Sequence, residues 1–459
     1  TQVLTLFPYT TLFRSSSCPV PGTAFTGRGP VAHDTAAMPG PINIVGAGIV
    51  GLSVAWALIR RGRPVRIFDA QAPGMGASFG NSGSLSSGSV VPLATPGAAM
   101  SGLKMLLDSD APLVVRRRYL LRALPWLRQF VRVSDEASVR QVADSLLEIL
   151  APTLPSWQRV LEEIGATDLL HHTGQLHLYP SRLALAKDDF AWRLRDDYGV
   201  RSEHLDRDAL LARQPGIGEA YPLGVFLPQA AAISDPHGLC VRLAHSLRAA
   251  GAEFVQAPVQ ALQPDGALQA QGRSWPAASC VLAAGAWSMR LLEPLGIRVP
   301  LETQRGYHVQ RRSLEVAPGQ VLRGPVVSAD SKVFIVPMRE GVRTGGTVEF
   351  AGLAAPEAPR RFALLRSSFS RVFPQAPALP AEDGESTWMG HRPCLPDTLP
   401  VLGRLPNHPN LWAAFGHGHL GLTMSAVTGE WLAQALCESA PPALARFRAD
   451  RPTLGARLG

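Results

Sequence analysis

The sequence is poor in cysteine and has no clustered pattern of metal ligands. Its five cysteines, Cys18, Cys240, Cys280, Cys394 and Cys437, are scattered along 459 residues and form no C-x-x-C pair. Disulfide-rich domains and structural zinc sites need closely spaced cysteines or histidines, so both classes are excluded. A reducing compartment is the simpler interpretation. Long polar low-complexity tracts are also lacking, and 46% of the residues are hydrophobic, which excludes disorder for most of the chain.

Lysine is scarce, and the net charge of +8 therefore comes from arginine; the three lysines are Lys104, Lys187 and Lys332. A basic protein is attracted to nucleic acid, membranes or anionic ligands. No zinc-finger, RNP-like or basic-zipper pattern accompanies the charge, so we expect no nucleic-acid partner. Part of the excess positive charge is concentrated in one segment, which contains Arg116, Arg117, Arg118, Arg122, Arg128 and Arg132.

Residues 1–37 show no periodicity that continues into a fold. Within Thr1–Ser17 the single basic residue, Arg14, follows the apolar part, whereas a secretory signal carries its charge before the apolar run. The stretch resembles translated adapter sequence, and Met38 stands just before the first strand pattern. We therefore expect residues 1–37 to be a disordered or artefactual tail.

An uncharged run, Ile42–Ile59, could cross a membrane by its length alone, but its internal pattern indicates a strand–turn–helix–strand unit. The pattern predicts a strand at Ile42–Val45, a helix that ends near Gly62, and a second strand at Val65–Phe68. The turn before the helix has the spacing G-x-G-x-x-G. In this context that spacing is typical of dinucleotide binding.

Each glycine of this turn has a separate physical task. Gly46 permits the tight turn, Gly48 lets the backbone approach a pyrophosphate, and Gly51 lets the helix pack closely on the strand. The helix begins at Ile49 and Val50, where unpaired N–H groups and the positive end of the helix dipole face the phosphates.

Residues after the second strand narrow the choice of dinucleotide. Asp69 is placed to accept hydrogen bonds from ribose hydroxyls and disfavours a 2′-phosphate, which favours FAD or NAD over NADP. An NAD enzyme would continue with alternating strands and helices. This chain instead has a stretch of glycines and serines, with Ser78, Asn81 and Ser82 as candidates to wrap a second face of the cofactor; a surface loop is the alternative.

A second strand–glycine loop–helix unit lies near the C-terminus, with a strand at Leu411–Phe415 and a helix from Leu422 to Leu436. The loop residues expected at the cofactor are Gly416, Gly418, Leu420, Gly421 and Thr423. A buried strand pattern at Ser279–Ala284 also leads into a candidate turn. A cofactor contacted from both ends of the chain suits FAD, because one helix N-terminus can face the pyrophosphate and the other the negative charge of a reduced flavin.

In the order and spacing of its motifs the chain resembles the FAD-dependent amine and amino-acid oxidoreductases of the D-amino-acid oxidase superfamily, and within them the bacterial D-amino-acid dehydrogenase small-subunit type. The matching stretches are Ile44–Gly51, Ser78–Gly88, Val90–Gly97, Val281–Ser288, Arg305–His308, Gly346–Phe350, Trp388–Gly403 and Phe415–Thr423. The resemblance implies a mixed α/β fold, in which a Rossmann-like FAD-binding domain of glutathione-reductase type is interleaved with an antiparallel-sheet substrate domain. The implied FAD-binding segments are 38–100, 226–300 and 385–459, and the implied substrate-binding segments are 101–225 and 301–384.

The resemblance also implies roles on the substrate side. Arg392, in the stretch that begins at Gly390, would grip the substrate carboxylate over the flavin, since a guanidinium fork suits bidentate binding. A structural ion pair with Asp397 is the alternative. Tyr307 would donate from its hydroxyl to the same carboxylate, or be an ordinary strand aromatic. His419 would bond the flavin or line the pocket, or cap backbone.

On the cofactor side the resemblance adds the backbone of Val259, beside the adenine, the turn residues Ala284, Gly285 and Trp287, and Gly390. Cys394 stands near the expected flavin position, but the local motif of the covalently flavinylated branch is not reproduced. We therefore expect FAD to be bound non-covalently.

The implied reaction is oxidation of a D-amino acid. A hydride passes from the substrate Cα to flavin N5, water hydrolyses the imine to a keto acid and ammonia, and a quinone or another non-oxygen acceptor takes the electrons. Two alternatives stay open. One is a glycine/sarcosine-type amine oxidase that uses oxygen, and the other is a flavin-binding, non-catalytic partner subunit.

Residues 103–132 mix leucines and aromatics with basic side chains, and Leu103–Leu150 as a whole predicts helix. An amphipathic basic stretch can lie on an anionic bilayer. A helical pair that covers the FAD domain is the alternative. We expect a cytoplasmic protein with peripheral contact to the inner membrane through this stretch.

Overall fold

The computed structural model describes residues 40–96, 113–379 and 384–456. The expected tail at 1–37 and residues 103–112 of the basic stretch lie outside the described residues. Two large sheets dominate the part of the chain that is described, one mostly parallel and one mostly antiparallel. The predicted mixed α/β fold is confirmed.

The first sheet is built from both ends of the chain. Its spatial order is β10 (Glu253–Gln256), β2 (Val65–Asp69), β1 (Ile42–Val45), β14 (Ser279–Leu282), β23 (His408–Phe415) and β22 (Val401–Leu405). All neighbouring pairs are parallel except β22 with β23. Strand β1 is fully buried and β14 nearly so, as expected for central strands covered on both faces. The predicted strands of both glycine-loop units are thus confirmed and lie in one sheet.

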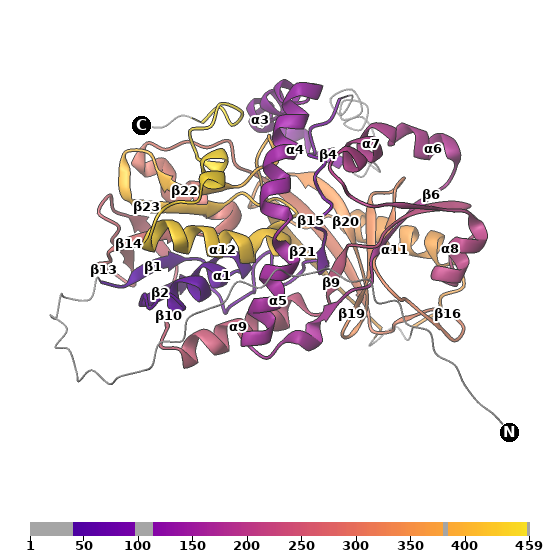
Figure 1. The fold of residues 1–459 in the computed structure, drawn as a ribbon, viewed down its shortest axis with the longest axis horizontal. Coiled ribbons are helices and arrows are strands. Elements are labelled where there is room, and N and C mark those ends of the chain that lie inside the picture. The colour runs from indigo at the N-terminus through magenta and orange to yellow at the C-terminus, as the bar shows by residue number, and fades with distance from the viewer. Residues whose placement is uncertain (1–39, 97–112, 380–383, 457–459) are drawn as a thin grey trace, which may run out of the picture. The chain divides into compact units, whose positions relative to one another are not determined.

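Helices from distant parts of the sequence pack on this sheet and on one another. They are α1 (Ile49–Ile59), α12 (Gly421–Cys437), α9 (Pro236–Ala249), α5 (Thr153–Glu163) and α4 (Glu136–Leu150). Figure 1 shows α1, in indigo, beside α12, in yellow. The two backbones nearly touch at Gly429, where an added Cβ would lie 2.4 Å from the Ser53 carbonyl oxygen. Helix α1 is apolar on all sides because it is packed on all sides.

The start of α9 follows from two adjacent residues. The Asp235 carboxylate accepts a hydrogen bond from the Gly238 N–H at 2.7 Å and caps the helix, and Pro236 is its first residue.

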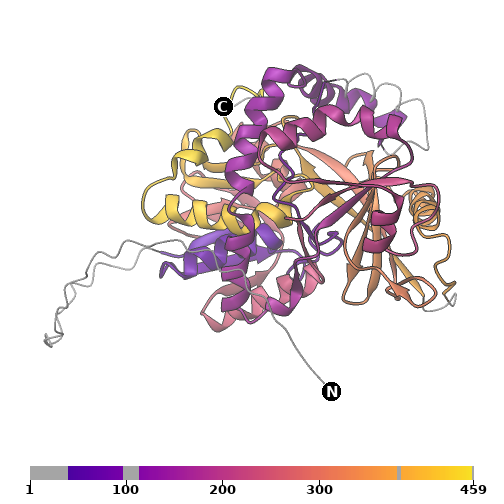
Figure 2. The ribbon, with the colours of Figure 1, turned by 45° about the vertical axis from the view of Figure 1, so that its right-hand side comes forward.

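The second sheet is larger and contains the strands that carry the expected substrate residues. Its spatial order is β21 (Glu385–Cys394), β15 (Glu302–Arg311), β20 (Gly341–Phe350), β19 (Val333–Met338), β18 (Val326–Ser328), β6 (Gln175–Tyr179), β8 (Leu223–Leu227) and β7 (Glu203–Leu205), and β4 (Leu113–Val115) pairs with β20. In Figure 2 the long orange strands of this sheet come forward. Helix α11 (Pro359–Val372) packs against β15 and β20.

Smaller elements complete the described fold. The short sheets contain β11 (Val259–Leu262), β12 (Leu268–Ala270) and β13 (Arg273–Trp275); β3 (Ser84–Leu85), β9 (Ala231–Ile233) and β5 (Leu170–His171); and β16 (Glu315–Ala317) with β17 (Gln320–Val321). The remaining helices are α3 (Leu120–Arg132), α6 (Arg182–Lys187), α7 (Asp189–Asp197), α8 (Arg207–Arg213) and α10 (Ser288–Leu292).

The prediction of helix throughout Leu103–Leu150 is wrong at Leu113–Val115. These residues form β4, which pairs in parallel with Val348–Phe350 of β20. Two adjacent valines favour a strand, and the edge of β20 offers them a partner that sequence alone does not reveal. Helices α3 and α4 account for most of the rest.

The apolar run Ile42–Ile59 is divided between β1 and α1, which removes the reason to consider it a membrane span. Among the described residues no helix combines the length and the apolar character needed to cross a bilayer.

Candidate functional site

A cavity of about 1640 Å³ lies where the carboxyl ends of β1, β2, β14 and β23 meet one face of the second sheet. Most of the site residues expected from the sequence line it: Gly46, Gly48, Ile49, Val50, Asp69, Ser78, Asn81, Ser82, Val259, Ala284, Gly285, Trp287, Tyr307, Gly390, Arg392, Gly418, His419, Leu420, Gly421 and Thr423. Ligands of open α/β sheets bind at this edge. The structure therefore brings residues from nearly the whole sequence to one place.

Gly46 and Gly51 hold the first glycine turn together by close packing. Gly46 has φ +114°, and an added Cβ would lie 2.3 Å from the Ala283 carbonyl oxygen. A Cβ on Gly51 would lie 1.9 Å from the Gly46 carbonyl oxygen. Gly51 does not line the cavity, which agrees with its predicted role in packing the helix against the strand.

Gly48 differs, because it borders the cavity and its added Cβ would meet nothing closer than the Ser78 Oγ at 3.4 Å. The absence of a side chain at Gly48 is thus not needed for packing and leaves room at the N-terminus of α1. That N-terminus has no acidic residue in its first turn, so its N–H groups and dipole suit a phosphate.

Two side chains order the loops around this N-terminus. The Asp69 carboxylate accepts hydrogen bonds from the backbone N–H groups of Ala47 at 2.7 Å and Gln71 at 2.9 Å. The Ser78 hydroxyl accepts from the Ile49 N–H at 3.0 Å. Asp69 therefore lies at the cavity edge beside the glycine turn, where a ribose would follow a pyrophosphate.

The C-terminal glycine loop reaches the same cavity. Gly416 and Gly418 have φ +86° and +56°, and the Gly418 N–H donates to the Pro393 carbonyl oxygen at 2.8 Å. Gly416 itself does not line the cavity, because it packs on Leu395, whose Cδ1 would lie 2.4 Å from an added Cβ. Helix α12 then begins at Gly421, with its N-terminus toward the cavity.

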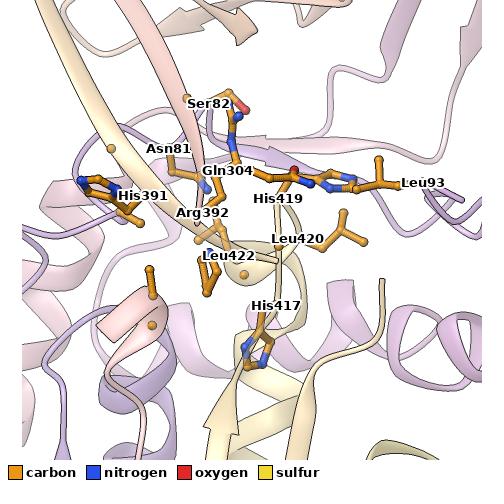
Figure 3. Close-up of a pocket in the computed structure, with 18 of the residues that line it drawn as sticks. Asn81, Ser82, Leu93, Gln304, His391, Arg392, His417, His419, Leu420 and Leu422 are labelled. Atoms are coloured by element: carbon orange, nitrogen blue, oxygen red, sulfur yellow. The ribbon is translucent and has the colours of Figure 1, made fainter. Parts of the chain in front are cut away.

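The histidines of this loop have different environments. His417 is buried, its Nε2 lies 3.1 Å from the Thr428 hydroxyl, and burial lowers its pKa to about 3. His419 faces the open cavity, as Figure 3 shows, and the surrounding protein and the nearby Arg392 lower its pKa. Both rings are therefore neutral at pH 7, and His419 is the one available to a ligand.

Arg392 is a cation in the cavity wall that has no carboxylate partner among the described residues. Its Nη1 donates to the Thr347 carbonyl oxygen at 3.0 Å, and among the described residues this is its one hydrogen bond. Burial lowers its pKa, but an arginine remains protonated at pH 7. The alternative pairing is contradicted, because Asp397 instead binds Arg451 at 2.7 and 2.9 Å. The remaining donors of Arg392 are thus free for an anionic ligand.

Tyr307 borders the cavity, but its hydroxyl is turned away from it. In the continuous β15–β21 ladder Gln304 is opposite Arg392, so Tyr307, an odd number of residues away, points to the other face. There its hydroxyl donates to Glu349 at 2.5 Å, and its ring packs on Phe362 of α11. Burial and Glu349 raise its pKa to about 12. Tyr307 is a strand aromatic in a polar network behind the sheet.

Gln304 lies in the cavity wall but is not among the residues expected from the sequence. It faces the cavity on the same side of the sheet as Arg392, and both side chains are visible in Figure 3. No hydrogen bond of its side chain is found within the described part of the chain. The alternation of side chains along a strand already places Gln304 and Tyr307 on opposite faces of the sheet. Which of the two faces the cavity depends on the pairing of β15 with β21, which the sequence does not reveal.

Trp388 was also missed. Its ring stacks on His308, with centroids 5.3 Å apart, and fills the space above Gly80 and Gly390, where an added Cβ would lie 1.9 Å from ring atoms in each case. The role of Gly390 is therefore to admit Trp388.

Helix α3 forms part of the cavity rim. Leu120, Leu121 and Leu124 line the cavity and are exposed, and Leu121 is 84% accessible.

Cys394 is buried and does not line the cavity, and burial raises the pKa of its thiol to about 12.

A strand–glycine turn–helix unit at each end of the chain, converging on one cavity with a free guanidinium in its wall, defines a dinucleotide-binding protein with a site for a small anionic ligand. Comparison with known proteins makes this more specific. The model of the family described as FAD dependent oxidoreductase matches residues 42–435, and the chain belongs to this family. Its cofactor is accordingly FAD, which the room at Gly48, the α1 N-terminus and Asp69 fit.

Curated relatives cover nearly the whole chain. A D-amino-acid oxidase of Bradyrhizobium diazoefficiens is 36% identical over 407 residues, which cover 87% of this chain and 96% of the relative. D-amino acid dehydrogenase 2 of Pseudomonas aeruginosa is 31% identical over 411 residues, covering 87% and 95%.

Solved structures share the fold. Glycine oxidase from Bacillus cereus has a TM-score of 0.68 at 20% identity and covers 90% of this chain and 99% of its own. L-proline dehydrogenase from P. horikoshii has a TM-score of 0.66 at 16% identity, with 90% and 97% covered. At these identities the likeness concerns the fold alone.

Proposed function

We propose that the protein catalyses the FAD-dependent oxidative deamination of D-amino acids. The observation that carries the proposal is Arg392, a partly buried guanidinium that faces the cavity with no carboxylate partner among the described residues. An unpaired charge in such a place raises the free energy of the folded protein unless a ligand of opposite charge binds to it. A carboxylate suits this role, because it can accept two parallel hydrogen bonds from a guanidinium. The names of the curated relatives, D-amino-acid oxidase and D-amino acid dehydrogenase, supply the handedness and the reaction.

The FAD-binding residues proposed from the sequence divide into groups. Gly48, Ile49 and Val50 at the start of α1 would hold the pyrophosphate, and Asp69 the ribose. The backbone of Val259 would lie at the adenine. The residues that would enclose the rest of the cofactor, without a covalent bond, are Ser78, Asn81, Ser82, Ala284, Gly285, Trp287, Gly418, Leu420, Gly421 and Thr423.

When bound, FAD supplies the hydride acceptor. The protein's own groups orient the substrate and set its charge. Arg392 would hold the carboxylate, and Gln304 and His419 offer neutral hydrogen-bonding groups to the rest of the molecule. The positive charge of Arg392 disfavours the ammonium form of a bound amine, so the substrate would be held with the nitrogen lone pair that assists loss of the Cα hydride. Water then hydrolyses the imine product to a keto acid and ammonia.

We retain the proposed division into an FAD-binding domain (38–100, 226–300 and 385–459) and a substrate-binding domain (101–225 and 301–384). The first sheet draws its strands from the first set of segments. Strand β21 begins at the proposed boundary at 385 and pairs with β15 of the second set, so the proposed domains share that sheet. Limited proteolysis tests the division by the order in which fragments separate.

The test of the reaction is anaerobic bleaching of the visible flavin absorption by D- and L-amino acids, glycine and sarcosine. Bleaching by D-isomers supports the proposal, whereas bleaching by glycine and sarcosine alone would favour the glycine/sarcosine-type oxidase. A yellow protein that no amine reduces would favour a non-catalytic partner subunit.

We propose further that a quinone or similar carrier, rather than oxygen, takes the electrons, as the dehydrogenase relatives' names suggest. With a reducing D-amino acid present, a soluble quinone analogue should reoxidise the flavin much faster than air does. Fast formation of hydrogen peroxide in air would contradict this.

For the location of the protein, we propose peripheral binding to an anionic membrane. Helix α3 exposes Leu120, Leu121, Leu124 and Val131 beside the exposed arginines Arg117, Arg118, Arg122, Arg128 and Arg132. Apolar side chains flanked by arginines suit a bilayer with anionic headgroups. Flotation with anionic vesicles at low salt should be lost in Leu121→Glu and kept in Leu183→Glu, which changes an exposed leucine of α6. Flotation unaffected by Leu121→Glu would refute the assignment.

A further inference from the structure

Arg392 is held by an irregularity in the neighbouring strands. Along β15 and β20, Arg305 is opposite Glu349 while Tyr307 is opposite Gly346, so two residues of β20 face the single Gly306 of β15. This is a one-residue β-bulge, a device that redirects backbone and side chains at sheet positions near functional sites. The two residues of β20 that face Gly306 are Thr347 and Val348.

Thr347 is unfavourable for stability where it stands. It has φ +55°, in the left-handed region that β-branched residues avoid, and its Oγ1 is buried with no hydrogen-bond partner within the described part of the chain. What this conformation provides is its carbonyl oxygen, which accepts the hydrogen bond from Arg392 Nη1. Strained backbone that persists at a ligand site is often part of the function of that site.

Gly306 supplies the other half of the arrangement. An added Cβ at Gly306 would lie 2.3 Å from both Cζ and Nη2 of Arg392, and 2.6 Å from Nη1. The guanidinium therefore lies directly over the backbone of β15, in space that any other residue would fill. Strand geometry accounts for this, because Gly306 and Arg392 are on the same face of paired strands.

We propose that Gly306 and the Thr347 bulge form a seat for Arg392, which fixes one nitrogen of the fork and directs its remaining donors into the cavity. Gly306 and Thr347 act as positioning residues through Arg392. The seat replaces the carboxylate partner that a buried arginine normally has, so the charge is held in place without being neutralised. This inference rests on the proposed role of Arg392 in binding the substrate carboxylate.

The test is the FAD-loaded variant Gly306→Ala, compared with Gly345→Ala on β20, where an added Cβ would lie at an ordinary 3.5 Å from the His308 Cβ. The readout is the dissociation constant of a short carboxylate without an amine, followed by the shift of the flavin absorption bands. Because losing both charge-assisted hydrogen bonds to a carboxylate costs on the order of 100-fold in affinity, we expect Gly306→Ala to weaken binding by about 100-fold, with Gly345→Ala near the parent. Thr347→Gly keeps the main-chain carbonyl that holds Arg392, so it should keep carboxylate affinity within about threefold of the parent. It should also raise Tm, because glycine adopts the left-handed conformation without strain.

Arg392→Met separates failure of the seat from failure of the proposed function. If Arg392→Met weakens carboxylate binding and a folded Gly306→Ala does not, the seat is refuted and the role of Arg392 stands. If neither variant weakens it, the role of Arg392 fails as well.

A double variant keeps the test decisive if Gly306→Ala alone does not fold. The flexible Met side chain in Gly306→Ala/Arg392→Met can move away from the new Cβ. The double variant should therefore fold, with a Tm close to that of Arg392→Met. Equal loss of stability from Gly306→Ala in both backgrounds would overturn the proposed contact, because the cost would then be unrelated to the guanidinium.

Discussion

Replacement of Arg392 by methionine should remove carboxylate binding without destabilising the protein. The side chain has one hydrogen bond, to the Thr347 carbonyl oxygen, and no counterion among the described residues. Hydrogen bonds to charged groups contribute about 1.5–3 kcal/mol each. Two such bonds to a carboxylate, at the lower figure, total about 3 kcal/mol, which corresponds to roughly 150-fold in the dissociation constant.

The same substitution should not lower the thermal stability of the protein. A partly buried cation with no ion-pair partner among the described residues is a cost to the folded state, and an apolar side chain of similar length removes that cost. We therefore expect Tm of Arg392→Met to equal or exceed that of the parent. Arg392→Lys should be intermediate in affinity, because an ammonium keeps the charge but cannot bond the Thr347 carbonyl and both carboxylate oxygens in one plane.

The assay is an anaerobic titration of flavin bleaching by a D-amino acid, with carboxylate binding measured in parallel. Arg404→Met, which changes an exposed arginine on β22, is the control for a general loss of positive charge. An unchanged half-bleaching concentration in Arg392→Met would refute the reasoning. A large fall in Tm would show instead that the guanidinium has a structural partner.

The remaining predictions concern the cofactor, Tyr307 and pH. Gly48→Ala should fold with the Tm of the FAD-free parent but lose FAD on gel filtration, whereas Gly46→Ala should fail to fold, since its Cβ would overlap the Ala283 carbonyl. FAD retained by Gly48→Ala would contradict the phosphate assignment. Tyr307→Phe should lose about 1–3 kcal/mol in the free energy of unfolding, because the buried Glu349 loses its donor, and keep the parent KM; a raised KM with unchanged stability would restore Tyr307 to the substrate site. Burial lowers the pKa of His417 to about 3 from an ordinary 6.5, so the unfolded chain binds the extra proton and stability falls as the pH drops through 6.5 toward 3. Urea unfolding at pH 7 and pH 5 should show a smaller loss for His417→Gln than for the parent, and an equal loss would mean that this ring is protonated in the fold.

The part of the site that local sequence determines was predictable. Gly46 and Gly51 follow from the geometry of a single strand–turn–helix unit, and the helix cap at Asp235 from two adjacent residues. These features depend on neighbours within a few positions, so their residue types carry the information.

The part that depends on pairing between distant segments was not predictable. Whether Gln304 or Tyr307 faces the ligand is decided by the register of β15 with β21, some 85 positions later in the sequence. Arg392 is free because Arg451 occupies Asp397, and nothing near Asp397 in the sequence indicates that. The bulge at Thr347 is the hardest case, since threonine is a residue that local preference would keep out of a left-handed conformation.

The order of strands in the first sheet has a consequence for biosynthesis. Strand β14 ends at residue 282, but its outer neighbour β23 begins at residue 408, and α12 follows it. While the intervening segment is being translated, the nascent chain carries β14 with an unpaired, apolar edge, which is a surface for aggregation and for chaperones. Both glycine loops meet only after the last strand has left the ribosome, so FAD loading is a late, post-translational step, and chains that terminate before residue 400 are expected to accumulate as chaperone-bound, colourless intermediates.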